Sequence, residues 1–243
     1  MGLNLTYKYS INFDSKKRDK KLIKYIIIHY TGMRKESQAI QRLRDPISKV
    51  SSHYFIKNNG DILNLVPDLY QAWHAGKSRW GNLHSLNKYS IGIEINNPGH
   101  DHVYKKFNPK QILALTSLLK YLKKRYNIKK TNILGHSDIS PDRKKDPGEK
   151  FPWSKLAQKN LCKWHKLKEH QIKRYRNLKI LNSQYEEFFD NLYKIGYSRI
   201  IGFKSINKKK NLIKAFQRRF RQNLINGKID QECLLISKNL LKV

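Results

Sequence analysis

The sequence is poor in cysteine, with only Cys162 and Cys233, and these two lie far apart. They form no CxxC motif and give no disulfide framework, so we interpret both as small buried apolar residues. No stretch reaches the length of about 20 apolar residues that a membrane span requires. The N-terminus lacks the apolar core and cleavage site of a signal peptide. The chain as written therefore predicts a cytoplasmic protein, and the periplasm or cell envelope is the alternative if a signal was removed.

Acidic residues are also scarce, with 18 Asp and Glu against 51 Lys and Arg, which gives a formal net charge of +33. A charge of this size creates a positive field around the molecule that attracts anionic polymers and surfaces. Nucleic acid, cell-wall polymer and an anionic membrane face all fit this field, and so does a general lysine bias of the genome. Because no DNA- or RNA-binding motif is present, we predict no specific nucleic-acid partner.

The chain does contain enough apolar residues to build a core. Hydrophobic residues make up 39% and aromatic residues 11% of its 243 positions, which is typical of globular rather than disordered proteins. This length suits one domain of ordinary size together with a small second one.

The first part of the chain alternates between strand and helix patterns. Residues 22–30 contain a run of β-branched residues that is typical of a buried central strand. Asn59-Gly60 supplies the positive φ angles of a tight turn and predicts a hairpin. Strands are expected at residues 22–30, 53–58, 61–66, 89–95 and 131–134, and helices at residues 37–44 and 109–126. The predicted fold class is α/β, a mixed central sheet flanked by helices.

The composition of the chain changes after Trp153. Residues 154–180 are strongly basic and are predicted to be helical. Three shorter helical patterns follow at residues 184–194, 207–222 and 230–241. We predict a first domain at residues 1–165, a basic helical linker at residues 166–182 and a small three-helix domain at residues 183–243.

Three potential metal ligands stand where predicted strands end or in the following loop. His29 ends the buried strand, His136 follows the strand that ends at Leu134, and Asp146 lies in the loop SPDRKKDPG. Two histidines and one carboxylate give zinc three protein ligands and leave a fourth position for water, which is the pattern of a catalytic site. Zinc lowers the pKa of that water to about 7. A single histidine at a strand end is more often structural, so the spacing alone leaves both interpretations open.

Glu94 lies between apolar residues in the strand expected at residues 89–95. A carboxylate in such a place is costly to bury without a partner, and a raised pKa would suit it as the general base for a zinc-bound water. The alternative is a solvent-facing glutamate on an alternating strand. Lys144, two residues before Asp146, has the charge to stabilise an oxyanion on an amide carbonyl, and its alternative is one more solvated lysine.

Five segments of the sequence together resemble a known family. They are IIIHYTG, SSHYFIKNNGDILNLVP, AWHAG, SIGIEINNPG and LGHSDISPDRKKDPGEKFPW, and they cover roughly residues 20–160. In this order they are similar to the N-acetylmuramoyl-L-alanine amidases of the AmpD/AmiD kind, within the superfamily of peptidoglycan recognition proteins and phage T7 lysozyme. The resemblance implies the fold of that superfamily. It also implies hydrolysis of the amide between N-acetylmuramic acid and L-alanine, in peptidoglycan or in 1,6-anhydro muropeptides.

The resemblance also implies roles for particular residues. It implies that His29, His136 and Asp146 bind Zn²⁺, that Glu94 is the acid/base carboxylate, and that Lys144 polarises the carbonyl.

Four further residues are predicted to contact the substrate. Trp73 offers a flat apolar face to a sugar ring or peptide stem, with core packing as the alternative, and His74 offers a hydrogen-bond donor. Asn96, together with Asn97, is expected to supply polar contacts at the rim. Arg143 suits a carboxylate of the stem peptide, because a guanidinium binds carboxylates through paired hydrogen bonds.

The C-terminal segment with AFQRRF and NGKID resembles, more weakly, the three-helix peptidoglycan-binding domain attached to some of these amidases. Phe216 and Phe220 lie on one helical face and are interpreted as core residues. The resemblance implies peptidoglycan or muropeptides as partners, while the sequence makes no prediction of oligomeric state. We expect residues 1–165 to fold and hydrolyse alone, with the tail raising local concentration on an insoluble polymer.

Two other functional classes fit parts of the sequence. A non-catalytic peptidoglycan-recognition module would lack the full set of zinc ligands, which this chain has. In some superfamily members a tyrosine precedes the histidine of the hairpin, but Ser52 stands there before His53, which favours the glutamate version and a structural role for His53. A nucleic-acid-binding protein is supported by charge alone and would show salt-dependent retention on DNA.

Overall fold

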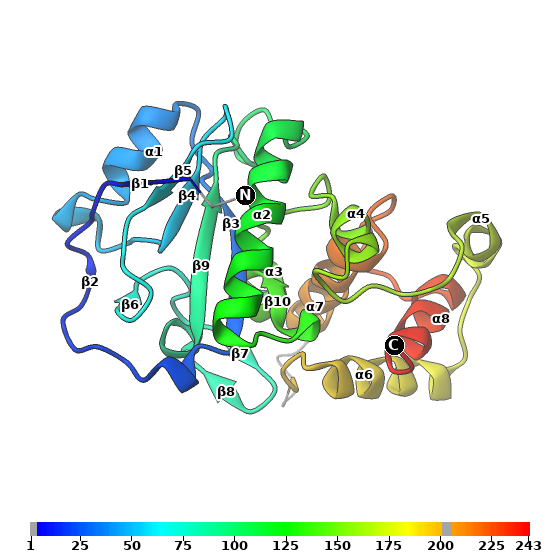
Figure 1. The fold of residues 1–243 in the computed structure, drawn as a ribbon. Coiled ribbons are helices and arrows are strands. Elements are labelled where there is room, and N and C mark those ends of the chain that lie inside the picture. The colour runs from blue at the N-terminus through cyan, green and yellow to red at the C-terminus, as the bar shows by residue number, and fades with distance from the viewer. Residues whose placement is uncertain (1–3, 201–205) are drawn as a thin grey trace.

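The computed structural model describes residues 4–200 and 206–243. Within these ranges a mixed six-stranded sheet carries helices on both faces (Figure 1). Its strands are β1 (Leu5–Tyr7), β3 (Tyr25–Tyr30), β4 (Tyr54–Ile56), β5 (Ile62–Asn64), β9 (Ser90–Ile95) and β10 (Ile133–Gly135). Two small ribbons pair β2 (Phe13–Asp14) with β6 (Gln71–Ala72) and β7 (Arg79–Trp80) with β8 (Leu83–His84).

The helices follow the same chain order. They are α1 (Glu36–Arg42), α2 (Pro109–Tyr126), α3 (His136–Ile139), α4 (Trp153–Gln158), α5 (Glu169–Ile172), α6 (Asn182–Ile195), α7 (Ile206–Phe220) and α8 (Gln231–Leu240). None of these helices is long and apolar enough to cross a membrane.

The main sheet has the strand order β1-β5-β4-β9-β3-β10. β4, β9, β3 and β10 run parallel, whereas β5 is antiparallel to β4 and parallel to β1. β3 lies between two parallel neighbours, which explains why Ile26, Ile27 and Ile28 are all fully buried. The predicted mixed sheet is confirmed, and so is the hairpin, because β4 and β5 pair across Asn59-Gly60.

Helix α2 covers one face of the sheet and has the bounds that the sequence predicts. Its buried leucines share a core cluster with β3 and β9: Leu115, Leu118, Leu119 and Leu122. That cluster includes Ile28 and Ile93, and neighbouring residues of a strand point to opposite faces. His29 and Glu94 therefore lie on the face away from α2.

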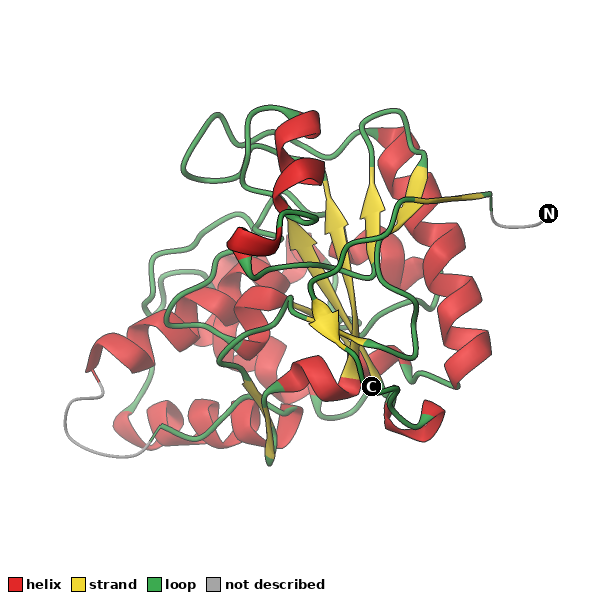
Figure 2. Ribbon diagram, turned by 90° about the vertical axis from the view of Figure 1, so that its left-hand side faces the viewer, coloured by secondary structure: helices red, strands yellow, loops and turns green. Residues whose placement is uncertain are grey.

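The face away from α2 is covered in two parts. Ala39 of α1 shares one apolar cluster with Phe55 of β4, and Phe216 of α7 shares another with Ile27 of β3. Figure 2 shows the sheet between the long helix on one side and the shorter helices on the other. His29 lines a cleft that residues of α1 and of the neighbouring loops also border.

The predicted helix over residues 154–180 is wrong in its extent. Helix in this segment, which the structure describes throughout, is limited to α4, α5 and one 3-10 turn. Asn160 has a φ of 56° shortly after α4 ends, a left-handed conformation that a helix interior does not adopt. The segment is rich in lysine and has few buried residues, so there is little apolar surface to support a longer helix.

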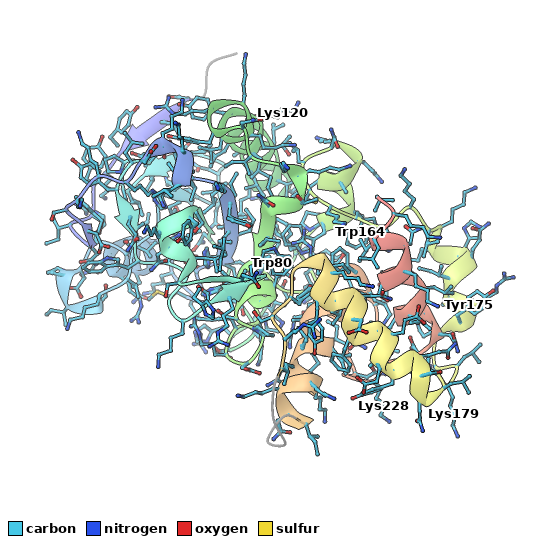
Figure 3. All side chains as sticks on the ribbon, turned by 90° about the horizontal axis from the view of Figure 1, so that it is seen from below. Trp80, Lys120, Trp164, Tyr175, Lys179 and Lys228 are labelled. Carbon is cyan, nitrogen blue, oxygen red and sulfur yellow. The ribbon has the colours of Figure 1, made fainter. Side chains whose placement is uncertain are left out.

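The three predicted C-terminal helices are confirmed as α6, α7 and α8, with ends that differ by at most two residues. They do not stand apart, because their apolar cluster extends to Leu134 of β10 and Ile139 of α3. Trp80 lies at this junction beside α6 (Figure 3), and its ring is 4.9 Å from that of Tyr197. Independent folding of residues 1–165 stays a prediction.

Candidate active site

Three side-chain atoms converge at the carboxyl ends of β3 and β10. Nδ1 of His29 and Nδ1 of His136 are 2.9 Å apart, and Oδ2 of Asp146 lies 3.1 Å and 3.0 Å from them. The three residues are 1%, 3% and 6% exposed. The structure thus brings together the three residues that the sequence predicts as metal ligands.

Local structure explains this convergence. β3 and β10 pair in parallel, with Gly135 opposite Ile28, so the residues that follow them, His29 and His136, are neighbours. The Ser137 N–H donates to the Asp146 carbonyl at 2.8 Å and closes the intervening loop. This bond places Asp146 next to the carboxyl end of β10, beside His136.

The tautomer of His136 follows from its outer hydrogen bond. Its Nε2 lies 3.1 Å from the carbonyl oxygen of Ala75. A carbonyl oxygen accepts but cannot donate, so Nε2 carries the proton in the neutral ring and Nδ1 keeps its lone pair. That lone pair faces His29 and Asp146.

The tautomer of His29 follows from a longer chain of hydrogen bonds. The Ser90 hydroxyl donates to the Leu86 carbonyl at 2.6 Å, so its oxygen accepts from His74 Nε2 at 3.2 Å. His74 Nδ1 then accepts from His29 Nε2 at 3.1 Å, which leaves Nδ1 of His29 unprotonated. Burial favours neutral rings, because it lowers the pKa of His29 to about 4 and that of His74 well below its ordinary value. A side chain at Gly92 would collide with the His74 ring.

Three unprotonated donor atoms therefore face one another at about 3 Å, an arrangement that is repulsive unless a cation lies among them. Tetrahedral zinc with bonds of about 2.0–2.2 Å separates its ligand atoms by about 3.3–3.6 Å, so a small outward shift of these side chains would admit the ion. Two imidazoles with fixed outer hydrogen bonds and one carboxylate fit a zinc ion.

Glu94 lies beside this cluster. It is the register partner of His29 in the parallel pair of β3 and β9. Its side chain borders the cleft and is half-buried, and Oε2 is enclosed with no hydrogen-bond partner among residues 4–200 and 206–243. Burial, and then the charge of Asp146, raises its pKa to about 8, while Lys144 acts in the opposite direction. The carboxyl group is therefore free to exchange a proton with a molecule in the cleft.

The cleft over the cluster has a volume of about 660 Å³. Besides the residues above, it is lined by Trp73, Arg143, Lys144 and Lys145. The Trp73 ring is held by a 2.7 Å hydrogen bond from Nε1 to Asp14, and Arg143 Nη2 donates to the Ala75 carbonyl at 2.6 Å. Of the predicted substrate contacts, Trp73 and Arg143 therefore border open space.

His74 and Asn96 are placed differently from the other predicted contacts. His74 borders the cleft, but both of its ring nitrogens are engaged behind His29. Asn96 lies outside the cleft lining and is buried, with its carbonyl accepting from Gln111 and its Oδ1 from Thr31. Its backbone carbonyl ties the end of β9 to Gln111 of α2, and its side chain is engaged by Thr31.

Sequence reasoning did not single out Ser90, Asp101 or Asp138. Ser90 has a weak signal, since it is a small polar residue at the start of an apolar strand. Asp101 borders the cleft from the loop after β9, and nothing in its local pattern marks it. His53, in contrast, has the structural role expected, because its Nδ1 accepts from the Gly92 N–H at 3.0 Å.

Comparisons with known proteins agree on one family. A family model described as N-acetylmuramoyl-L-alanine amidase matches residues 18–149. The chain is 35% identical over 232 residues to the N-acetylmuramoyl-L-alanine amidase AmiD of Escherichia coli, which covers 90% of this chain and 83% of AmiD. It is 37% identical over 108 residues to the 1,6-anhydro-N-acetylmuramyl-L-alanine amidase AmpD of the same organism, a match that covers 44% of this chain and 57% of AmpD.

Solved structures give the same answer for the fold. AmiD of E. coli, in complex with the substrate anhydro-N-acetylmuramic acid-L-Ala-D-γ-Glu-L-Lys, matches with a TM-score of 0.79 and 34% identity over 94% of this chain and 91% of that one. AmpDh3 of Pseudomonas aeruginosa, in complex with anhydromuramic pentapeptide, matches with a TM-score of 0.79 and 28% identity over 94% of each chain. The chain belongs to the N-acetylmuramoyl-L-alanine amidase family.

Proposed function

We propose that the protein is a zinc-dependent amidase that hydrolyses the bond between N-acetylmuramic acid and L-alanine, with 1,6-anhydro muropeptides among its substrates. The observation that carries this proposal is the buried set of two imidazole lone pairs and one carboxylate. The substrate class is supported by AmiD and AmpDh3, whose structures hold anhydromuramyl peptides.

In this proposal His29, His136 and Asp146 would hold the zinc ion beside the cleft that all three line. Bound zinc supplies a Lewis acid that makes hydroxide accessible near neutral pH. His74 and Ala75 accept the outer protons of the two imidazoles and keep both rings in the orientation that binding needs.

Glu94 serves as the acid/base group. Its carboxylate takes a proton from the attacking water and delivers it to the nitrogen of the leaving L-alanine. As the carbon–nitrogen bond breaks, a carbon–oxygen bond forms, and the products are a lactyl carboxylate and a free amine. A carboxyl group with a pKa near neutrality is suited to both transfers.

Other cleft residues bind and polarise the substrate. The Lys144 ammonium donates hydrogen bonds to the carbonyl oxygen as negative charge develops on it. Arg143 is held by the carbonyls of Ala75 and Lys77 through Nη2 and Nε, which leaves Nη1 to meet a stem-peptide carboxylate. Trp73 presents its ring face to the sugar or stem.

Product analysis tests this proposal. The purified protein is incubated with an anhydromuramyl peptide and, separately, with purified sacculi, and the products are identified by mass spectrometry. We expect free anhydro-N-acetylmuramic acid and a peptide with an L-alanine amino terminus from the small substrate. Chelator should stop the reaction and added zinc should restore it. Cleavage at another bond, or cleavage unaffected by chelator, would contradict the proposal, and cleavage of sacculi alone would contradict the substrate class.

A further inference from the structure

A buried polar cluster joins the C-terminal helices to the turn that carries His136. Oδ2 of Asp138 accepts from the Gly135 N–H at 2.7 Å and from Nη1 of Arg219 at 2.7 Å. Its Oδ1 accepts from the Tyr197 hydroxyl at 2.8 Å. Asp138, Arg219 and Tyr197 are 2%, 3% and 1% exposed. Both carboxylate oxygens are therefore held by residues about 60 to 80 positions away in the chain.

Asp138 lies two residues after His136, so a change in its position would also change the backbone that carries the histidine. Helix α3 has four residues and begins at His136 itself. A helix this short is not stable through its own hydrogen bonds and depends on tertiary contacts. The bond from Asp138 to the Gly135 N–H fixes the backbone directly before the histidine.

Arg219 also holds the strand that leads into this turn. Its Nη2 donates to the Ile133 carbonyl at 2.9 Å, at the start of β10. Its guanidinium lies 3.9 Å from the ring centre of Trp153, where the planar group stacks favourably. One side chain of α7 thus fixes both the first residue of β10 and the carboxylate of α3.

A buried ion pair is costly, and apolar residues of similar volume stabilise a contact between helices equally well. Hydrogen bonds, unlike apolar contacts, are directional. The bonds of this cluster therefore fix the positions of particular atoms in β10 and in the turn. We propose that Arg219 and Tyr197 are positioning residues which act through Asp138 to orient the His136 imidazole. The C-terminal helices would then be part of the metal centre's framework. This inference rests on the proposed role of His136 as a ligand.

The test compares Arg219→Met with a matched control, Arg221→Met. Arg221 is also 3% exposed and lies two residues further along the chain, but it pairs with Asp230 inside the C-terminal helices. Metal-free proteins are titrated with Co²⁺, whose absorption spectrum reports ligand geometry, and zinc affinity is measured by chelator competition. All measurements are made below the unfolding temperature of each variant, and the conservative Tyr197→Phe is included in case Arg219→Met does not fold.

We expect Arg219→Met to alter the Co²⁺ spectrum and to weaken zinc binding by about 10- to 100-fold, as the loss of an outer contact does. Tyr197→Phe should produce a smaller change in the same direction, and Arg221→Met should match the wild type in both measurements. A wild-type spectrum and affinity in a folded Arg219→Met, or in Tyr197→Phe if the former does not fold, would overturn the inference. Wild-type protein that takes up no Co²⁺ would instead overturn the proposed ligands themselves, and the inference with them.

Discussion

The hydroxyl of Ser90 lies behind the cleft, yet it decides which nitrogen of His29 is available to a metal. It accepts from His74, which in turn accepts from His29. We expect Ser90→Ala to release the His74 ring and to weaken zinc binding by about 10-fold, measured by chelator competition. Ser52→Ala is the control. Ser52 is equally buried, but its hydroxyl donates to the Gly92 carbonyl and takes no part in the hydrogen bonds that link Ser90, His74 and His29. Equal affinities in the two variants would refute the role given to Ser90.

Glu94 is expected to act in turnover and not in metal binding. Its carboxyl borders the cleft beside His29 but lies outside the cluster of donor atoms. We expect Glu94→Gln to retain one zinc per chain and to lose about 10²- to 10⁴-fold in kcat. Elemental analysis and initial rates on an anhydromuramyl peptide check this. Near wild-type turnover at full zinc occupancy would show that another group transfers the proton.

The same carboxyl makes the stability of the metal-free protein depend on pH. Because its pKa is raised from 4.5 to about 8 in the folded state, the unfolded chain releases this proton at lower pH than the folded one. The linked contribution to stability is therefore lost as the pH rises through this range. As the pH rises from about 5 to 8, the free energy of unfolding of Glu94→Gln should increase by about 2 kcal/mol relative to that of the wild type. A shift of one pKa unit corresponds to about 1.36 kcal/mol, and solvent screening reduces this value for a partly exposed group.

Urea unfolding of both metal-free proteins at several pH values measures this gain. His29 contributes the opposite dependence below about pH 6.5, because burial lowers its pKa, but it is present in both proteins and cancels in the difference. A difference between the two proteins that stays constant with pH would contradict the raised pKa of Glu94.

Among the secondary-structure elements, the sequence predicts best those whose bounds are set by residues close together in the chain. Helix α2 has the predicted bounds because its apolar spacing, its Pro109 start and its Asn108 cap all act within a few residues. The hairpin of β4 and β5 follows from Asn59-Gly60 in the same way. The helix over residues 154–180 is the counterexample, since helical propensity without a buried face does not maintain a long helix.

Contacts between distant elements are what the sequence does not reveal. His29 and Glu94 are both predicted in strands, but their register depends on parallel pairing across intervening chain. The resemblance to the amidase family, not periodicity, placed them in one site. Asp138 and Arg219 lie 81 residues apart, and no local pattern in either segment indicates that they meet.

In the whole molecule, the C-terminal helices pack against residues 1–165, and this contact affects whether residues 1–165 can fold alone. Removing residues 166–243 exposes apolar residues such as Leu134 and takes away Arg219 and Tyr197, which hold Asp138. We expect residues 1–165 alone to melt at lower temperature, to bind zinc more weakly and to lose activity on muropeptides and sacculi alike. The sequence-based expectation differs, because a detachable tail would spare the small substrate.

Thermal melting and rates on both substrates distinguish these outcomes. The rates are measured at high salt, which weakens retention by the many basic residues. Full activity of residues 1–165 on an anhydromuramyl peptide would show that the C-terminal helices serve polymer binding alone.

In the proposed reaction, the zinc-dependent site adds water to the lactyl carbonyl and breaks its amide bond. The most direct measurement is digestion of an anhydromuramyl peptide in water enriched in the heavy isotope of oxygen, with mass spectrometry of both products, before and after chelation. We expect one heavy oxygen in the muramic acid carboxylate, an unlabelled peptide that begins with L-alanine, and no products after chelation. Label in the peptide, or products that form despite chelation, would contradict the proposed reaction.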